Sequence, residues 1–173
     1  RNFGQDEADR GLSECRRFIQ TNTRKAVRGA VGLHASFTVS DETIRAASKL
    51  ATELNAILHV HVAEDGADVE DAKKRGYSGV IDRLASNGAL LPNTIVAHGI
   101  HLERAEVQRA LENKCWFVQN PRSNKGNRVG YPVSLAGIDR VAVGTDGYPA
   151  NMADEYTALA ALALENNDGK TDL

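Results

Sequence analysis

Residues 56–64 read AILHVHVAE, and they form the clearest strand signal in the chain. Aliphatic residues alternate with histidines, a pattern typical of a β-strand, in which residues two apart share a face. His59 and His61 are therefore expected to point the same way, and Glu64 follows where the strand gives way to a loop. The stretch predicts a strand with polar chemistry on one face and at its carboxyl end.

Four further apolar stretches flank this strand and alternate with helical patterns. We expect strands within residues 30–37, 93–102, 115–120 and 134–147, and helices over residues 7–23, 41–55, 69–87 (broken at two glycines), 103–113 and 153–165. Thr38, three residues before Asp41, predicts the start of the second helix, and Asp41 is expected to pair with Arg45 on its exposed side. This alternation predicts an α/β fold with a parallel sheet.

Polar residues stand at or near the carboxyl ends of all five expected strands: His34, His61, His98, Asn120 and Asp146. The intervals between them are 27, 37, 22 and 26 residues, so one βα unit averages 28 residues. Eight such units approach the roughly 250 residues typical of a (β/α)8 TIM barrel, whose chemistry lies at that end of the strands. We therefore expect a partial barrel of about five βα units, because a chain of 173 residues cannot close the barrel alone.

The composition excludes several classes of function. A formal net charge of −2 gives no electrostatic footprint for nucleic acid or an anionic membrane. The longest apolar run, residues 158–164, is far below the roughly 20 residues of a membrane-spanning helix. Two cysteines, Cys15 and Cys115, are too few for a disulfide framework and predict a cytoplasmic protein. Thiol-redox, serine-nucleophile and phosphate-loop motifs are absent from the sequence.

The candidate site residues each have a structural alternative. His61 suits a metal ligand and Glu64 a proton carrier, yet His59 and His61 could be core histidines or a two-histidine metal pair. His98 ends its strand before Gly99 but could belong to a helix start, and His101 is expected to be structural. Asp146 is expected to be buried and metal-bound, or else to form an Asx turn.

Two other segments receive simpler interpretations. Residues 120–124, NPRSN, are expected to form a polar loop with a weaker case for substrate contact, and Cys115 and Trp116 are expected in the core. Taken together, however, histidine and carboxylate side chains in register on successive strand ends predict a Zn(II) or Fe(II) site with an open coordination position.

Five motifs in this register carry a family resemblance: HASF (34–37), HVHVAE (59–64), VAHGIHL (96–102), NPRSN (120–124) and GTDG (144–147). They resemble strands four to eight of the amidohydrolase superfamily, in its ATZ/TRZ-type chlorohydrolase/deaminase branch. The longer strings NPRSNKGNRVGYP (120–132) and GTDGYPANMADEY (144–156) most resemble the SsnA-type aminohydrolases. The resemblance implies that residues 1–173 are the C-terminal portion of the barrel, beginning after strand three, without an internal domain boundary.

The resemblance also implies roles for individual residues. His61 corresponds to a metal ligand, and Glu64 to the catalytic acid/base. His98 corresponds to the histidine that orients the reacting water, or binds a second metal in binuclear members. Asp146 corresponds to a residue that is both metal ligand and catalytic base, and His34 to a substrate contact.

The resemblance has gaps and departures. Asn120 and Asn124 are further substrate-binding candidates, but Gln119 stands where the family often has a histidine, and Lys125 stands where an apolar residue is usual. The family's two-histidine motif of strand one has no counterpart. Two expected metal ligands are therefore lacking, so we expect weak or no metal binding and little activity from the chain alone.

The implied activity is metal-dependent hydrolysis of a C–N bond, by an aminohydrolase, deaminase or chlorohydrolase, in a small heterocyclic or amidine-like substrate. The divalent metal is expected to be zinc, with iron as the alternative. One alternative activity is cyclic-amide hydrolysis of the dihydroorotase or hydantoinase kind, which usually requires a lysine in the strand within residues 26–37; none lies there. Another is a catalytically incomplete barrel. An open barrel exposes sheet edges, so a homo-oligomer or association with the missing part of the barrel is expected.

Overall fold

A single parallel sheet forms the centre of the computed structural model, which describes residues 4–171. Its five strands lie in the order in which they occur along the chain: β1 (Val31–Gly32), β2 (Leu58–Val62), β3 (Ile95–His98), β4 (Trp116–Gln119) and β5 (Val141–Val143). Each strand pairs in parallel with the next. The expected α/β fold with five βα units of a barrel is confirmed.

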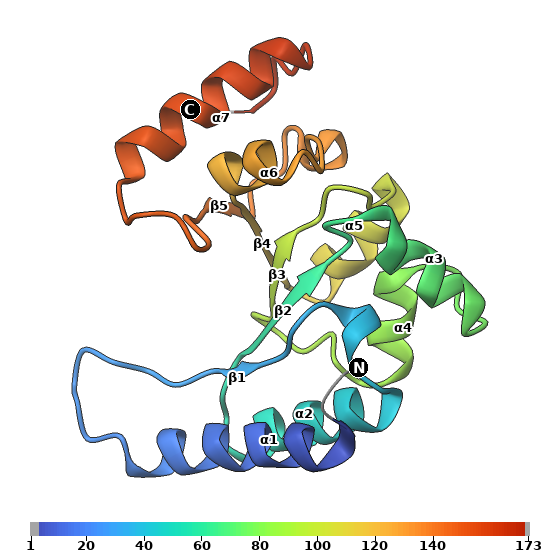
Figure 1. The fold of residues 1–173 in the computed structure, drawn as a ribbon, viewed down its shortest axis with the longest axis vertical. Coiled ribbons are helices and arrows are strands. Elements are labelled where there is room, and N and C mark those ends of the chain that lie inside the picture. The colour runs from blue at the N-terminus through green and yellow to red at the C-terminus, as the bar shows by residue number, and fades with distance from the viewer. Residues whose placement is uncertain (1–3, 172–173) are drawn as a thin grey trace.

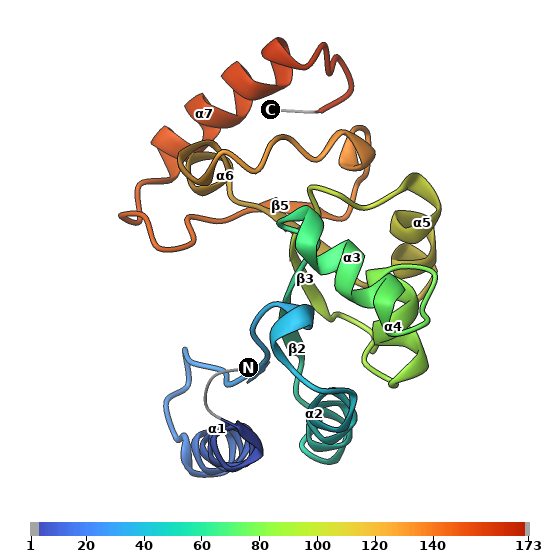
Figure 2. The same cartoon turned by 45° about the vertical axis from the view of Figure 1, so that its right-hand side comes forward.

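Helices connect the strands and cover one face of the sheet (Figure 1). They are α1 (Gly4–Thr21), α2 (Asp41–Glu53), α3 (Gly66–Lys74), α4 (Val80–Ser86), α5 (Arg104–Glu112), α6 (Pro121–Asn127) and α7 (Met152–Glu165), with 3-10 turns η1 (Ser36–Thr38) and η2 (Val133–Leu135). Figure 2 shows α1 beside α2 at one end of the molecule and α7 beside α6 at the other. Among residues 4–171, no helix is both long and apolar enough to cross a membrane.

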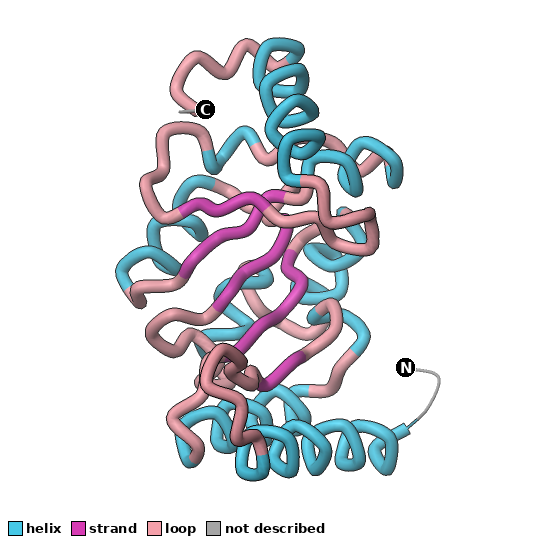
Figure 3. Tube along the Cα trace, turned by 90° about the vertical axis from the view of Figure 1, so that its left-hand side faces the viewer, coloured by secondary structure: helices cyan, strands magenta, loops and turns pink. Residues whose placement is uncertain are grey.

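The two faces of the sheet differ in burial. In β2, Leu58, Val60 and Val62 are buried toward the helices, whereas His59 and His61 are half-buried on the opposite face. The prediction that the two histidines share a face is therefore confirmed. That face, the barrel interior, is seen in Figure 3, where the strands lie in front of the helices.

Trp116 marks how open this inner face is. The sheet register pairs Trp116 with Ile95, and Ile95 with His59, so Trp116 lies on the same inner face as His59. The Trp116 side chain is exposed there. Cys115 is buried as expected, but the prediction of Trp116 in the core is wrong. The neighbouring strands leave it uncovered on the inner face, where Arg140 lies over its ring at 4.5 Å.

The start of α2 differs from the prediction. Ser40, rather than Thr38, caps the helix by accepting a hydrogen bond from Thr43 N, because Thr38 belongs to the preceding 3-10 turn. Asp41 does not pair with Arg45 on the surface. It accepts a hydrogen bond from Arg83 instead, since α4 packs next to this helix start.

Residues 120–124 are also more regular than expected. They open α6 and do not form a loop, with Pro121 at the first helical position, where its fixed φ and missing N–H are tolerated. This helix directs several polar side chains toward the carboxyl ends of the neighbouring strands.

The Asp168 carboxylate holds the segment after α7 in place through several hydrogen bonds, and this leads to a prediction for acid pH. Burial alone would raise the pKa of Asp168, but hydrogen bonds from Thr171 and Tyr131 outweigh it and lower the pKa to about 2. A carboxylate with a depressed folded-state pKa adds stability above its ordinary pKa and loses it as the pH falls through the folded value. We expect limited proteolysis of this segment to increase between about pH 4 and pH 2.

The matched variant for that experiment is Asp168→Asn, which keeps the shape of the side chain and removes its titration. It should show faster proteolysis at neutral pH and a weaker pH dependence below pH 4. Equal pH dependence in the two proteins would contradict the assignment to Asp168.

Candidate functional site

Three histidines gather around His61 on the inner face of the sheet. The His61 ring centroid lies 5.6 Å from that of His34, 5.8 Å from that of His59 and 5.1 Å from that of His98. The strands bring three of the five predicted strand-end residues together because their carboxyl ends meet at one edge of the sheet.

A group of potential metal ligands lies at this edge. One ligand atom each from His61, Glu64 and His98 falls within 4.8 Å of the others. Glu64 Oε2 is 3.6 Å from His98 Nε2, and its other oxygen accepts a hydrogen bond from Asn127 Nδ2 at 3.2 Å. Imidazole nitrogens and carboxylate oxygens at such separations could hold a divalent metal.

His98 is the most enclosed member of the group, with none of its surface exposed. Its Nδ1 lies 2.9 Å from Asn124 Oδ1, and Asn120 Nδ2 lies 3.5 Å from both ring nitrogens. The amide oxygen of Asn124 can only accept, so Nδ1 is assigned the proton and Nε2 carries the lone pair toward Glu64. Such an outer hydrogen bond is what orients a histidine that binds a metal.

Three of the strand ends adopt left-handed backbone conformations. The φ angles are +48° at Ala63, +72° at His98 and +49° at Asp146, values that residues other than glycine rarely adopt. Backbone strain of this kind persists where the surrounding structure enforces it, and it concentrates at functional sites. At these positions it redirects the chain immediately after the strand, at the edge where the polar side chains meet.

Asp146 lies at the end of β5 in a position different from the one expected. Its prediction as a buried residue is wrong: it is exposed, because β5 is the edge strand of the sheet and no further strand among residues 4–171 lies beside it. A hydrogen bond from Ser123 Oγ to its Oδ2, at 2.6 Å, is the main cause that lowers the pKa of Asp146. Interaction with the nearby imidazoles of His98 and His61 lowers this pKa further, although Asp146 lies outside the group within 4.8 Å.

Two residues of α6 belong to the site that were not among the predicted site residues. Ser123 binds Asp146, and Asn127 Nδ2 reaches Glu64 Oε1 at 3.2 Å and Ser123 Oγ at 3.4 Å. The spacing of Ser123 and Asn127 could have identified them, because residues four apart share a helix face. That inference requires this segment to be recognised as a helix, whereas residues 120–124 were expected to form a loop. This face of α6 connects Glu64 on one side of the site to Asp146 on the other.

The loop that carries Asp146 is anchored by a buried ion pair. Glu155, with no exposed surface, accepts hydrogen bonds from Arg122 Nε at 2.6 Å and from Arg122 N at 3.1 Å. Arg122 also donates to Pro149 O, within the loop, and its guanidinium lies 5.4 Å from the Tyr148 ring centroid. The pair thus fixes the loop against the start of α6.

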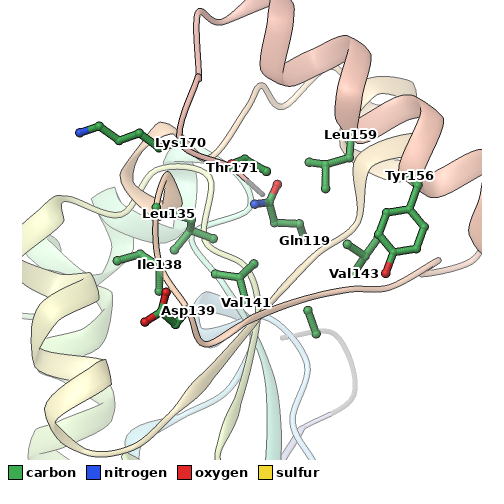
Figure 4. Close-up of a pocket in the computed structure, with 12 residues that line it drawn as sticks. Gln119, Leu135, Ile138, Asp139, Val141, Val143, Tyr156, Leu159, Lys170 and Thr171 are labelled. Carbon is green, nitrogen blue, oxygen red and sulfur yellow. The ribbon is translucent and has the colours of Figure 1, made fainter. Parts of the chain in front are cut away.

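The predicted substrate contact His34 lies at the margin of the site, and Gln119, where the sequence departs from the family pattern, lies outside it. His34 is exposed, and its Nδ1 lies 3.0 Å from the Thr38 hydroxyl. Gln119 is buried in a different place, a cavity of about 350 Å³ between β5 and α7 (Figure 4). Its side chain is on the helix-covered face, so the departure noted at this position lies away from the inner face.

The protonation states of the donors fit a divalent metal. Burial lowers the pKa of His61, and the nearby His98, His59 and His34 lower it further, so the imidazole is neutral near pH 7. The hydrogen bond from Ser123 favours the ionised form of Asp146. Neutral imidazole and ionised carboxylate are the forms that bind a metal.

The comparison with protein families decides what this arrangement is. The amidohydrolase family model matches residues 5–172. The chain belongs to the amidohydrolase family. The membership expected from its five strand-end motifs is confirmed.

Curated relatives of this amidohydrolase chain are deaminases. It is 36% identical to a 5'-deoxyadenosine deaminase of Methanosphaera stadtmanae, over 80% of this chain and 33% of that protein. It is 33% identical to a 5-methylthioadenosine/S-adenosylhomocysteine deaminase of Thermoanaerobacter pseudethanolicus, over 89% of this chain and 41% of that protein. The chain thus spans about one third to two fifths of the length of these relatives.

Solved structures of amidohydrolases share the fold of this chain. An adenosine deaminase of Xanthomonas campestris with bound zinc matches with a TM-score of 0.81 at 23% identity, over 91% of this chain and 38% of its own. An atrazine chlorohydrolase of Arthrobacter aurescens, complexed with zinc, matches with a TM-score of 0.67 at 19% identity, over 80% of this chain and 32% of its own. Both shares of coverage agree with a partial barrel.

Proposed function

We propose that the complete protein is a metal-dependent aminohydrolase that removes an amino group from a small heterocyclic substrate. The observation that carries the proposal is the convergence of His61, Glu64 and His98 within 4.8 Å at the carboxyl edge of an amidohydrolase sheet. The deaminase relatives support this reaction class, and their names point to a purine ring as the heterocycle.

The metal would be held by His61 and Asp146, with His98 as a further ligand if two ions bind, and zinc fits their nitrogen and oxygen donors. When bound, the metal supplies a Lewis acid that brings the pKa of a water molecule close to 7. Asp146 accepts the proton of the attacking water, a role suited to a carboxylate that Ser123 keeps ionised.

The other residues act on the substrate. Glu64 would donate a proton to the ring nitrogen beside the carbon under attack, take the remaining proton of the hydroxyl group that has added there, and pass it to the departing ammonia. The proton held by Asp146 then returns to Glu64 and restores both residues. His98, fixed by Asn124, stabilises the tetrahedral carbon centre as charge develops on it. His34, Asn120 and Asn124 are the proposed substrate contacts, and Asn127 keeps Glu64 aligned.

The proposal covers the complete protein, of which residues 1–173 would be the C-terminal portion of the barrel. The open inner face and the unpaired edge of β5 are where the missing part of the barrel, or a second copy of the chain, would associate. Location in the cytoplasm, and low activity of the chain alone, stay predictions.

Removal of the metal ligand His61 tests the proposed function. We expect the complete protein to release ammonia from 5'-deoxyadenosine, 5'-methylthioadenosine or guanine, to lose this activity with a chelator, and to regain it with zinc. His61→Ala should lower zinc affinity by more than the roughly 10- to 100-fold typical of outer-shell substitutions.

The matched control is His101→Ala, which removes an exposed histidine from the adjacent loop. It should leave zinc content and turnover unchanged. Full turnover by His61→Ala, or no ammonia release from any purine tested, would contradict the proposed function.

A further inference from the structure

A buried carboxylate outside the proposed catalytic group ties together two of the loops that carry it. Asp68, in the first turn of α3, is 1% exposed. One oxygen accepts hydrogen bonds from Ser36 Oγ at 2.5 Å and Phe37 N at 3.0 Å, and the other accepts from Ala63 N at 2.7 Å. A single side chain therefore joins the loop after β1 to the end of β2.

The residues that Asp68 holds flank the site on both sides. Ser36 and Phe37 follow His34 by two and three residues, while Ala63 lies between His61 and Glu64. Ala63 has a φ of +48°, and its carbonyl accepts a hydrogen bond from His101 N at 2.9 Å. Asp68 therefore binds the backbone amide of Ala63, the residue whose left-handed conformation turns the chain from β2 toward Glu64.

Arg83 also holds the loop that donates to Asp68, through hydrogen bonds to the backbone of that loop. Arg83, fully buried, donates to Ser36 O at 2.6 Å and to Val39 O at 2.7 Å. Ser36 is therefore held by its hydroxyl and its carbonyl at once. Burial raises the pKa of Asp68, and the hydrogen bonds from Ser36, Ala63 and Phe37 oppose this rise.

We propose that Asp68 is a positioning residue: it fixes the loop of His34 and the Ala63 turn before Glu64 in one arrangement, and so sets the distance between these groups and His61. The inference rests on the proposed function for its catalytic meaning. Its structural content, a carboxylate that locks two loops together, is independent of the reaction.

The test is Asp68→Asn in the complete protein. An amide has one acceptor oxygen and an NH2 group in place of the second oxygen, so the variant must lose either the bond to Ala63 or those to Ser36 and Phe37. We expect amide hydrogen exchange in residues 34–38 and 62–64 to accelerate at least tenfold in the metal-free protein. Zinc affinity, measured by chelator competition, should fall about 10- to 100-fold, the range of supporting interactions around metal sites.

Two further variants separate positioning from general destabilisation. Val107→Ala removes buried apolar atoms from α5 and none of these hydrogen bonds, so it should speed exchange globally and leave zinc affinity unchanged. Ser36→Ala removes only one of the three bonds and should fold even if Asp68→Asn does not, with a smaller local effect in the same segments.

The outcomes distinguish this inference from the proposed function. If the unsubstituted protein binds no zinc, the proposed function is wrong, while local exchange still decides whether Asp68 locks the loops. If Asp68→Asn and Ser36→Ala change exchange only as Val107→Ala does, the positioning role is wrong whatever the metal result.

Discussion

Asp146→Asn is expected to lower kcat of the complete protein by about 10²- to 10⁴-fold, the usual contribution of a positioned acid or base. The substitution is nearly isosteric, and the amide oxygen can still accept the Ser123 hydroxyl that now donates to Asp146 Oδ2 at 2.6 Å. What disappears is the negative charge, and with it both the proton acceptor and one proposed metal ligand. The effect should therefore appear in kcat and in zinc content rather than in the stability of the fold.

The opposite end of the same strand supplies the control for this experiment. Asp139 is exposed just before β5, whereas Asp146 follows it at the carboxyl end. Asp139→Asn removes the same charge from the same strand and should leave kcat and zinc content within twofold of the original. If both variants lose kcat and zinc to the same extent, the effect is one of overall charge and not of the Asp146 position. If Asp146→Asn keeps its full kcat, Asp146 is not the catalytic base.

The order of the sheet and the positions of the histidines could be predicted from the sequence because both depend on local patterns. Alternation in β2 places His59 and His61 on one face whatever surrounds the strand. The strand-end position of His98 similarly follows from a short apolar run that stops at a polar residue. Parallel pairing then brings these ends together without further information.

The missed features depend on contacts between segments far apart in the chain. Residues 120–124 have turn-forming composition, yet packing against α7 stabilises them as the start of a helix, which Glu155 anchors through Arg122. Asp146 and Trp116 are exposed because no further strand among the described residues covers the inner face of the sheet at these positions. The hydrogen bonds of Asp68 connect residues 31 and 32 positions apart in sequence, a separation at which no periodic pattern gives a signal.

Arg83→Met is expected to lower the free energy of unfolding by about 3–5 kcal/mol, the loss typical when one partner of a buried ion pair is removed. The Arg83 side chain has no exposed surface, and its Nε donates to Asp41 Oδ1 at 2.8 Å. The backbone carbonyls of Ser36 and Val39 also accept hydrogen bonds from the Arg83 guanidinium. Methionine fills much of the same space but leaves the carboxylate and both carbonyls without these donors.

Urea unfolding of Arg83→Met should be compared with that of Arg109→Met, because the two arginines make ion pairs in opposite environments. Arg109 Nη1 lies 2.7 Å from Asp82 Oδ1, as short as the buried pair, but its side chain is 45% exposed. Solvent screens such a pair, and its loss should lower the free energy of unfolding by no more than about 1 kcal/mol. If both variants lose the same amount, burial is not what makes Arg83 important. A larger loss at Arg83 would mean that burial makes this pair important for stability, although α4 contributes no residue to the proposed site.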